Sequence, residues 1–363
     1  MPDGLVNAPA GVRIERAASD GCTPQQAQGT LEVLIFQKFV FGSPNLASGR
    51  LCLVFLTIGL TLAGCDSSPS VARPTPPSGS RPGAIRVMAT TTVVADLVRQ
   101  VGGDRVVVDC LMAAGIDPHS YKATPRDTDR LLQADLVVAS GLHLEGRLAA
   151  LLDKLADRVP YLALADRLPA ERLLAATGDF ADPHVWFDAA LWSLLPSELA
   201  EALAGVDPAH AAEYRDRASA QAASLRDLDE TVRRRIATIP ESRRVLVTAH
   251  DAFRYFGRAY GIEVVGVQGT NTTSEAGLGD INRLVELVVS RGIPAVFVET
   301  SVADRNMTAL LEGARARGHE VRLGGRLYSD SLGDPASGAD SLAGALTANV
   351  ETIVAALAPE AAP

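Results

Sequence analysis

The sequence predicts an α/β protein with two lobes, each with a mostly parallel sheet flanked by helices, joined by one long connecting helix. Residues 84–206 alternate β-branched runs with helical patterns, which is typical of βαβ units. Residues 207–238 contain no glycine and, after Pro208, no proline, so they favour a single helix of roughly 30 residues. The alternation resumes over residues 243–358. A chain of 363 residues is long enough to bury the cores of two such lobes.

The N-terminal part is predicted to lie outside the lobes. The apolar run within residues 51–65 is too short for a comfortable transmembrane helix and indicates an export signal. Leu-Ala-Gly-Cys, ending at Cys65, resembles a bacterial lipobox, whose cysteine is lipidated; the alternatives are an ordinary signal or a buried helix that contains a cysteine. We therefore expect an extracytoplasmic protein held to a membrane by lipid. Residues 1–50 are interpreted as an extended N-terminus or a start codon assigned too far upstream, and residues 66–83 as a flexible tether.

Charge and cysteine content exclude several classes of site. The net charge of −9 and the 5% aromatic content argue against a nucleic-acid partner, which would favour a basic surface with stacking side chains. Once Cys65 is lipidated and the residues before it are removed, Cys110 is the remaining thiol. Neither a disulfide framework nor a cysteine-based metal site is therefore expected.

The predicted first lobe contains two histidines that follow the same dipeptide. Asp117-Pro118 precedes His119 in a loop after the strand expected at 106–111, and Asp-Pro precedes His184 before a helical stretch. Proline fixes the backbone before each histidine, and the aspartate can orient it, as metal sites require. The alternative is two unrelated turns, because Asp-Pro is a common turn opening. His143, between two leucines, competes as a candidate but is left out of the site.

The second lobe places further ligand-type residues where strands end. A β-branched run ends at His250, and the strand expected at 295–297 is followed by Glu299. A strand expected at 321–323 leads through two glycines to Asp330. Ligands of open α/β sheets bind beyond the carboxyl ends of the strands. Glu299 is consistent with a metal ligand, a structural acid or an acceptor that orients a ligand, and we favour the last.

Taken together, the candidate site draws His119 and His184 from the first lobe and His250 and Asp330 from the second. Three neutral imidazoles and one carboxylate suit Zn²⁺, and also Mn²⁺ or Fe²⁺, whereas Ca²⁺ and Mg²⁺ prefer oxygen ligands. The sequence therefore predicts a transition-metal site shared by the two lobes.

Residues 84–358 resemble the zinc- and manganese-binding lipoproteins that serve as solute-binding components of bacterial ABC-type metal importers, of the cluster A-I type. The resemblance implies two α/β lobes joined by one long helix, four metal ligands at His119, His184, His250 and Asp330, and a membrane permease as partner. The third ligand position varies in the family between His and Glu. Zinc-dedicated members often carry a His-rich loop, and residues 166–179 contain no histidine, so the cargo stays open between Zn²⁺ and Mn²⁺. The motifs that carry the resemblance are DPHSY, SGLHLE, DPHVW, TAHDAFRYFGRAYG, FVETSV and YSDSLGD.

The expected mechanism is capture and handover by a monomer, without catalysis. Metal binds as the lobes close, and docking on the permease triggers its release. A single stiff crossover helix predicts a small rotation or a local loop movement. The alternatives are a secreted zinc hydrolase, in which Glu299 would be the base, and a surface adhesin. Catalytic zinc usually has three protein ligands and an open position, which four protein ligands do not leave.

Overall fold

A computed structural model describes residues 83–176 and 180–358. The predicted extended N-terminus (1–50), the signal with Cys65 (51–65) and the tether up to residue 82 lie outside the described residues. Within the described ranges, no helix combines the length and the apolar character needed to cross a membrane.

The first lobe is built on one parallel sheet of four strands in the order β2-β1-β3-β4. Its helices form where the sequence carries capping signals. Thr124 caps α2 through a reciprocal hydrogen-bond pair with Asp127, and Pro125 occupies the first helical position. The elements are β1 (Ile85–Ala89), α1 (Thr92–Gly102), β2 (Val106–Cys110), α2 (Pro125–Leu132), β3 (Leu136–Ala139), α3 (Ala149–Ala156) and β4 (Tyr161–Ala163).

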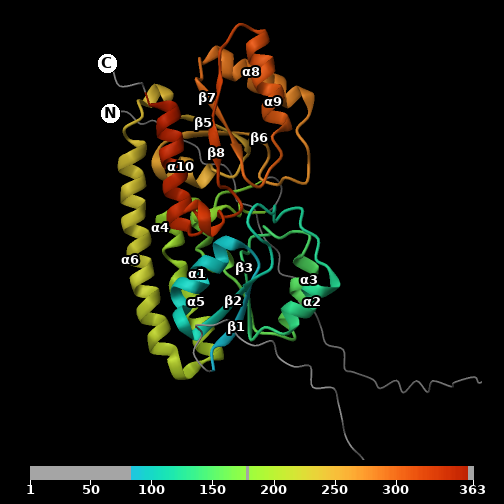
Figure 1. The fold of residues 1–363 in the computed structure, drawn as a ribbon, viewed down its shortest axis with the longest axis vertical. Helices are drawn as coiled ribbons and strands as arrows, with labels where there is room; N and C mark the ends of the chain where they lie inside the picture. The colour runs from blue at the N-terminus through green and yellow to red at the C-terminus, as the bar shows by residue number, and fades with distance from the viewer. Residues whose placement is uncertain (1–82, 177–179, 359–363) are drawn as a thin grey trace, which may run out of the picture. The chain divides into compact units, whose positions relative to one another are not determined.

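Three helices lead from the first lobe to the second. They are α4 (Ala189–Trp192), α5 (Leu195–Val206) and α6 (Ala211–Ile236). The helical conformation is interrupted between α4 and α5. Pro196 lies in the first turn of α5, where a proline is tolerated. Helix α6 has 26 residues, somewhat fewer than expected, because Pro208–His210 form a 3₁₀ turn before it. It extends beside both lobes (Figure 1) and contacts α1 and α5 in one and α7 and α10 in the other.

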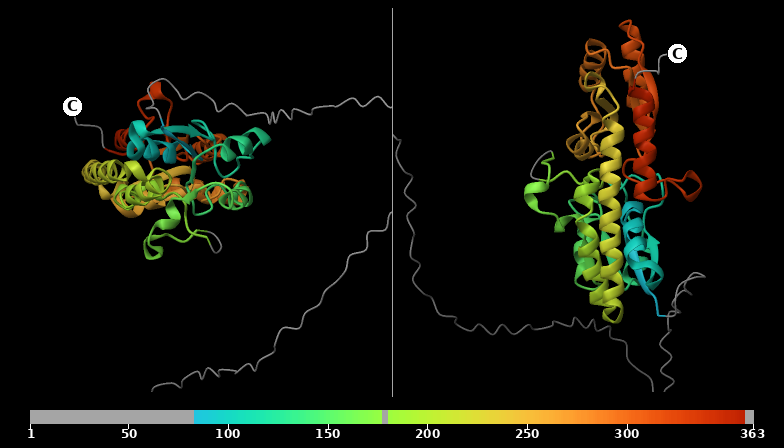
Figure 2. Two further views of the ribbon diagram at one scale, coloured as in Figure 1. Left: turned by 90° about the horizontal axis from the view of Figure 1, so that it is seen from below. Right: turned by 90° about the vertical axis from the view of Figure 1, so that its left-hand side faces the viewer.

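The second lobe contains two parallel strand pairs, β5-β6 and β7-β8, with β5 packed beside β7. Helix α10 returns along α6 (Figure 2), and Arg235 Nε donates to Glu351 Oε1 at 2.8 Å between them. The elements are β5 (Val245–His250), α7 (Arg254–Tyr260), β6 (Glu263–Gln268), α8 (Leu278–Ser290), β7 (Ala295–Glu299), α9 (Arg305–Ala316), β8 (Arg322–Leu327) and α10 (Leu342–Leu357).

The last strand corrects the sequence prediction. Strand β8 begins at Arg322 and continues through Gly324 and Gly325, which we had interpreted as the loop after a shorter strand. The glycines are required by close packing rather than by a turn. A Cβ atom at Gly324 would lie 2.7 Å from the Phe297 ring, and one at Gly325 would lie 2.4 Å from Thr352. This extension carries the chain to the sheet edge just before Asp330.

One hydrophobic core passes through both lobes. A single cluster of buried side chains includes residues of the first sheet, of α5 and α6, and of the second lobe. Its members include Val87, Leu199, Leu225, Phe256, Phe297 and Leu346. The two lobes are therefore packed on a common interior, and the predicted fold class is confirmed.

Candidate metal centre

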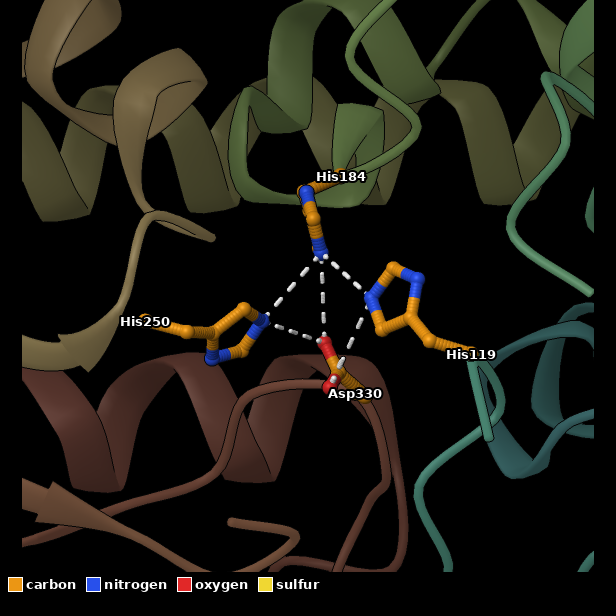
Figure 3. A group of neighbouring side chains, drawn as sticks. All are labelled: His119, His184, His250 and Asp330. Atoms are coloured by element: carbon orange, nitrogen blue, oxygen red, sulfur yellow. Dashed lines mark hydrogen bonds and ion pairs between the residues drawn. The ribbon is translucent and has the colours of Figure 1, made fainter. Parts of the chain in front are cut away.

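Four buried side chains meet where the two lobes face each other. His119 and His184 come from the first lobe, and His250 and Asp330 come from the second (Figure 3). One ligand atom from each residue lies within 4.8 Å of every other. The structure thus brings together all four residues that the sequence singled out.

Four of the six distances between these atoms match the edges of a metal-coordination tetrahedron. His184 Nε2 lies 3.3 Å from His119 Nε2 and 3.4 Å from His250 Nε2. Asp330 Oδ1 lies 3.4 Å from His184 Nε2 and 3.3 Å from His250 Nε2. Zn–N and Zn–O bonds of about 2.0–2.2 Å give tetrahedral edges of roughly 3.3–3.6 Å. His119 lies somewhat further from Asp330, with Nε2 at 3.9 Å from Oδ2, and all four ligand atoms are within 4.8 Å of one another.

Both Asp-Pro-His triplets form the same turn. The backbone N–H of His119 donates to Asp117 Oδ1 at 2.8 Å, and that of His184 donates to Asp182 Oδ1 at 3.1 Å. A side-chain acceptor two residues before the donor is the Asx turn that aspartate favours. Asp117 Oδ2 also accepts from Thr272 Oγ1 of the second lobe at 2.7 Å. Both triplets therefore play the same structural role: each fixes the backbone of a ligand-type histidine.

Two carboxylates orient the imidazole rings. Asp182 Oδ1 lies 2.7 Å from His184 Nδ1, and Glu299 Oε2 lies 2.5 Å from His250 Nδ1. Glu299 Oε1 also accepts the backbone N–H of His250 at 2.8 Å. When Nδ1–H donates to a carboxylate, the lone pair of Nε2 faces the other way, towards the cluster. Glu299 touches the side of the His250 ring that faces away from the four donor atoms.

Asp330 presents a carboxylate oxygen with little competition from hydrogen bonds. It is 1% exposed, and Ser301 Oγ donates to Oδ2 at 3.3 Å. Apart from the imidazoles of His184 and His250, whose Nε2 atoms lie 3.4 Å and 3.3 Å away, no described residue contacts Oδ1 as a donor. A buried carboxylate oxygen is costly unless donors or a cation satisfy it. An oxygen that faces only ligand-type nitrogens fits a cation at this point.

The electrostatics differ among the three histidines. Burial lowers the pKa of His119 to about 4. Burial also acts to lower the pKa of His184, but hydrogen bonds with Asp182 and Asp330 outweigh it and raise the pKa to about 9. For His250, the charges of Asp330 and Glu299 overcome burial and raise the pKa well above its usual value. The pKa of Asp330 is correspondingly held well below its usual range, against the effect of burial, by His250 and His184. Protons and a metal ion therefore compete for the same nitrogen atoms.

The remaining histidines lie away from the four donor atoms. His143 is exposed, and its ring packs against Phe180. His210 Nδ1 contacts Asp207 Oδ2 at 2.8 Å, and His319 Nε2 contacts the carbonyl oxygen of Ile293 at 2.9 Å. His319 is thus structural, and His210 is half-buried.

Sequence reasoning missed Tyr255 as a support of the site. Its hydroxyl donates to the carbonyl oxygen of Asp182 at 3.0 Å and accepts from the backbone N–H of Leu174 at 2.9 Å. This buried tyrosine lies in α7 directly after His250, so it joins the two ligand-bearing segments. No local pattern in the sequence singled it out.

Tyr255→Phe should lower the free energy of unfolding by about 1–3 kcal/mol, because it leaves a buried N–H and a buried C=O without their partner. Urea denaturation of the metal-free protein measures this change. An unfolding free energy equal to that of the wild type would contradict the supporting role of the hydroxyl.

The fold and the site define a class of two-lobed α/β metal-binding proteins. The solved structure of the periplasmic zinc binding protein TroA from Treponema pallidum has a TM-score of 0.74 with this chain, at 41% identity, covering 76% of this chain and 100% of that one. The manganese-binding lipoprotein MntA of Bacillus subtilis is 41% identical over 306 residues, covering 84% of this chain and 97% of MntA. The zinc-binding protein TroA of T. pallidum is 41% identical over 272 residues, covering 75% and 88%.

Residues 87–356 match the family model described as ZnuA, zinc-uptake complex component A, periplasmic. The chain belongs to this family. The resemblance found in the sequence motifs is thereby confirmed.

Proposed function

We propose that this chain captures a divalent transition-metal ion, Zn²⁺ or Mn²⁺, between its lobes and delivers it to the permease of an ABC-type importer. His119, His184, His250 and Asp330 would hold the ion as transported cargo. The observation that carries the proposal is the cluster of four buried side chains whose ligand atoms all lie within 4.8 Å of one another. Family membership supports uptake as the context in which the ion is bound.

Two similar relatives are named for different metals. MntA is named for manganese and TroA for zinc, and each is 41% identical to this chain. Four of the six donor–donor distances are 3.3–3.4 Å, which suits tetrahedral Zn²⁺. Asp330 Oδ2, 3.9 Å from His119 Nε2, offers a fifth donor, as Mn²⁺ would favour. We propose that both ions bind and that Zn²⁺ binds more tightly, because N/O sites follow that affinity order.

We further propose that the protein acts as an extracytoplasmic monomer, anchored through lipidated Cys65, and that it catalyses no reaction. Names of relatives as lipoproteins support the anchor. A zinc hydrolase requires an open coordination position for water, and four side chains fill a tetrahedral shell. Neither the site nor the relatives favour the hydrolase or the adhesin.

Metal analysis of the purified full chain tests the proposal. We expect one equivalent of Zn²⁺ or Mn²⁺ per chain after loading and dialysis. Competition between the two ions, followed by elemental analysis, measures the preference. Wild-type protein that retains only a small fraction of an equivalent of either ion would refute the metal site.

Metal affinity should fall as the pH is lowered from 9 to 6. A pKa of His184 raised to about 9 means that this ring holds a proton at neutral pH in the metal-free protein. Binding must displace that proton, so a lower pH favours the protonated, metal-free form. Titrations at fixed ionic strength across this range measure the slope. An affinity that is independent of pH would contradict coordination by imidazole nitrogen.

A further inference from the structure

We infer that metal ions reach the site through two adjoining surface cavities, and that His143, at the boundary between them, binds the ion transiently on its way. This inference rests on the proposed function and adds a route and a kinetic ligand to it. The family motif SGLHLE contains His143, and the four donor atoms do not use it.

The inner cavity connects the metal centre to the surface. It has a volume of about 620 Å³, and both His119 and His143 line it. His119 is 3% exposed, whereas His184 and His250 are 0% exposed and Asp330 is 1% exposed. The side of the centre that solvent reaches is thus the His119 side. The facing wall is a polar loop with Thr270 and Asn271, whose oxygens can replace water around a cation.

The outer cavity is lined by acidic residues, of which Asp153 and Asp166 are exposed and Glu145 is buried. It has a volume of about 380 Å³. His143 and Phe180 line both cavities, so they form the boundary between them. Acidic groups in a concave surface raise the local concentration of cations and increase their association rate. Arg147 lines the inner cavity, so this attraction is confined to the outer one.

The loop that carries His143 is held in a costly conformation. Leu142 has φ 50° and His143 has φ 60°, and they are the only non-glycine residues with positive φ in the described part of the chain. The N–H of Leu142 donates to Asp166 Oδ1 at 2.7 Å. Buried Glu145 accepts from the N–H of Ser140 at 2.8 Å and from Thr90 Oγ1 at 2.5 Å. Backbone strain that several hydrogen bonds maintain is often found at functional positions.

In this strained loop the imidazole of His143 packs against one exposed side chain rather than into the core. The His143 ring lies edge-on to Phe180, with centroids 4.4 Å apart, and Phe180 is 52% exposed. The ring therefore packs beside both cavities, and the side chain is exposed. An exposed imidazole between acidic groups and His119 can exchange water ligands of an incoming ion for nitrogen one step at a time.

A transit ligand leaves a kinetic signature that a structural residue does not. Because it stabilises the path and not the end states, its loss slows association and dissociation by the same factor and leaves Kd unchanged. Trp186 provides the signal, since its ring lies 5.4 Å from that of His184. Stopped-flow fluorescence of the full chain with Zn²⁺ gives the association rate, and transfer to a chelator gives the dissociation rate.

The test compares His143→Asn with His143→Asp. Both residues tolerate positive φ, and they differ in whether they carry a ligating carboxylate. We expect His143→Asn to lower both rates by about three- to tenfold with unchanged Kd, and His143→Asp to restore them. Asp153→Asn should slow association and weaken its salt dependence, whereas Asp157→Asn, in the residue that ends the same helix, should not.

Two results would overturn the inference while leaving the proposed function intact. One is wild-type rates in both His143→Asn and Asp153→Asn. The other is faster dissociation with weaker Kd in His143→Asn, which would make His143 a structural residue. A wild-type chain that binds no Zn²⁺ would instead refute the proposed function itself.

Discussion

Asp330→Ala should lower the affinity for Zn²⁺ by at least about a hundredfold. Structural zinc sites with four ligands bind with about 10–16 kcal/mol, or roughly 3 kcal/mol per ligand, which corresponds to about two orders of magnitude. Asp330 also supplies the only negative charge among the four donors, so its loss leaves a divalent cation among neutral imidazoles. Competition with a chelator of known affinity measures the change, and His250→Ala should behave similarly.

Asp340→Ala serves as the matched control for this experiment. Asp340 is an exposed acid in the same segment of the chain, ten residues further on, and it is not one of the four clustered donors. We expect the Asp340→Ala variant to bind Zn²⁺ with the same affinity as the wild type. Equal metal content in Asp330→Ala and wild type would show that the assigned ligands are wrong.

Glu299→Gln should lower the affinity by about 10- to 100-fold, although Glu299 does not reach the donor atoms. One of its oxygens accepts the backbone N–H of His250, and the other lies 2.5 Å from Nδ1 of the same residue, where it faces an Nδ1–H donor when Nε2 is left free for a metal. Glutamine has one oxygen, so its amide N–H₂ must face one of these donors. Relief of that clash by a change of tautomer would put the proton of His250 on Nε2 and block coordination.

Asp182→Asn provides a sharp comparison from the other lobe. A single oxygen of Asp182 accepts both the backbone N–H and the Nδ1–H of His184. Asparagine retains one such oxygen, so the loss of affinity should be smaller than for Glu299→Gln. Equal losses in the two variants would mean that charge, and not tautomer control, explains the effect. Exposed Glu263→Gln should bind as the wild type does.

The sequence predicted most of the fold because its signals are local. The β-branched runs and the long segment without glycine each depend on residues that are neighbours in the chain. The exception was β8, where the pair Gly324-Gly325 suggested a loop. A side chain at either glycine would clash with Phe297 or Thr352, which are distant in the sequence. No local pattern could therefore reveal why glycine is needed there.

The four clustered residues were also visible in the sequence, since each is a ligand type near a strand end or after Asp-Pro. Their supports were only partly visible. Glu299 follows a predicted strand, but Tyr255 and Thr272 act through contacts with the opposite lobe. The importance of His143 depends on two cavities and on a positive φ, which are three-dimensional properties. A residue between two leucines carries no sign of them.

The common hydrophobic core has a consequence for how this chain folds. Because α6 and α10 bury side chains of both lobes in one cluster, we expect that neither lobe folds on its own. The chain should therefore melt in a single cooperative transition, with amide hydrogens of β1 and β5 exchanging through the same global opening. Sequence differences between relatives are then expected to accumulate in the surface loops. Chimeras that exchange the whole two-lobed region should fold more often than chimeras that exchange a single lobe.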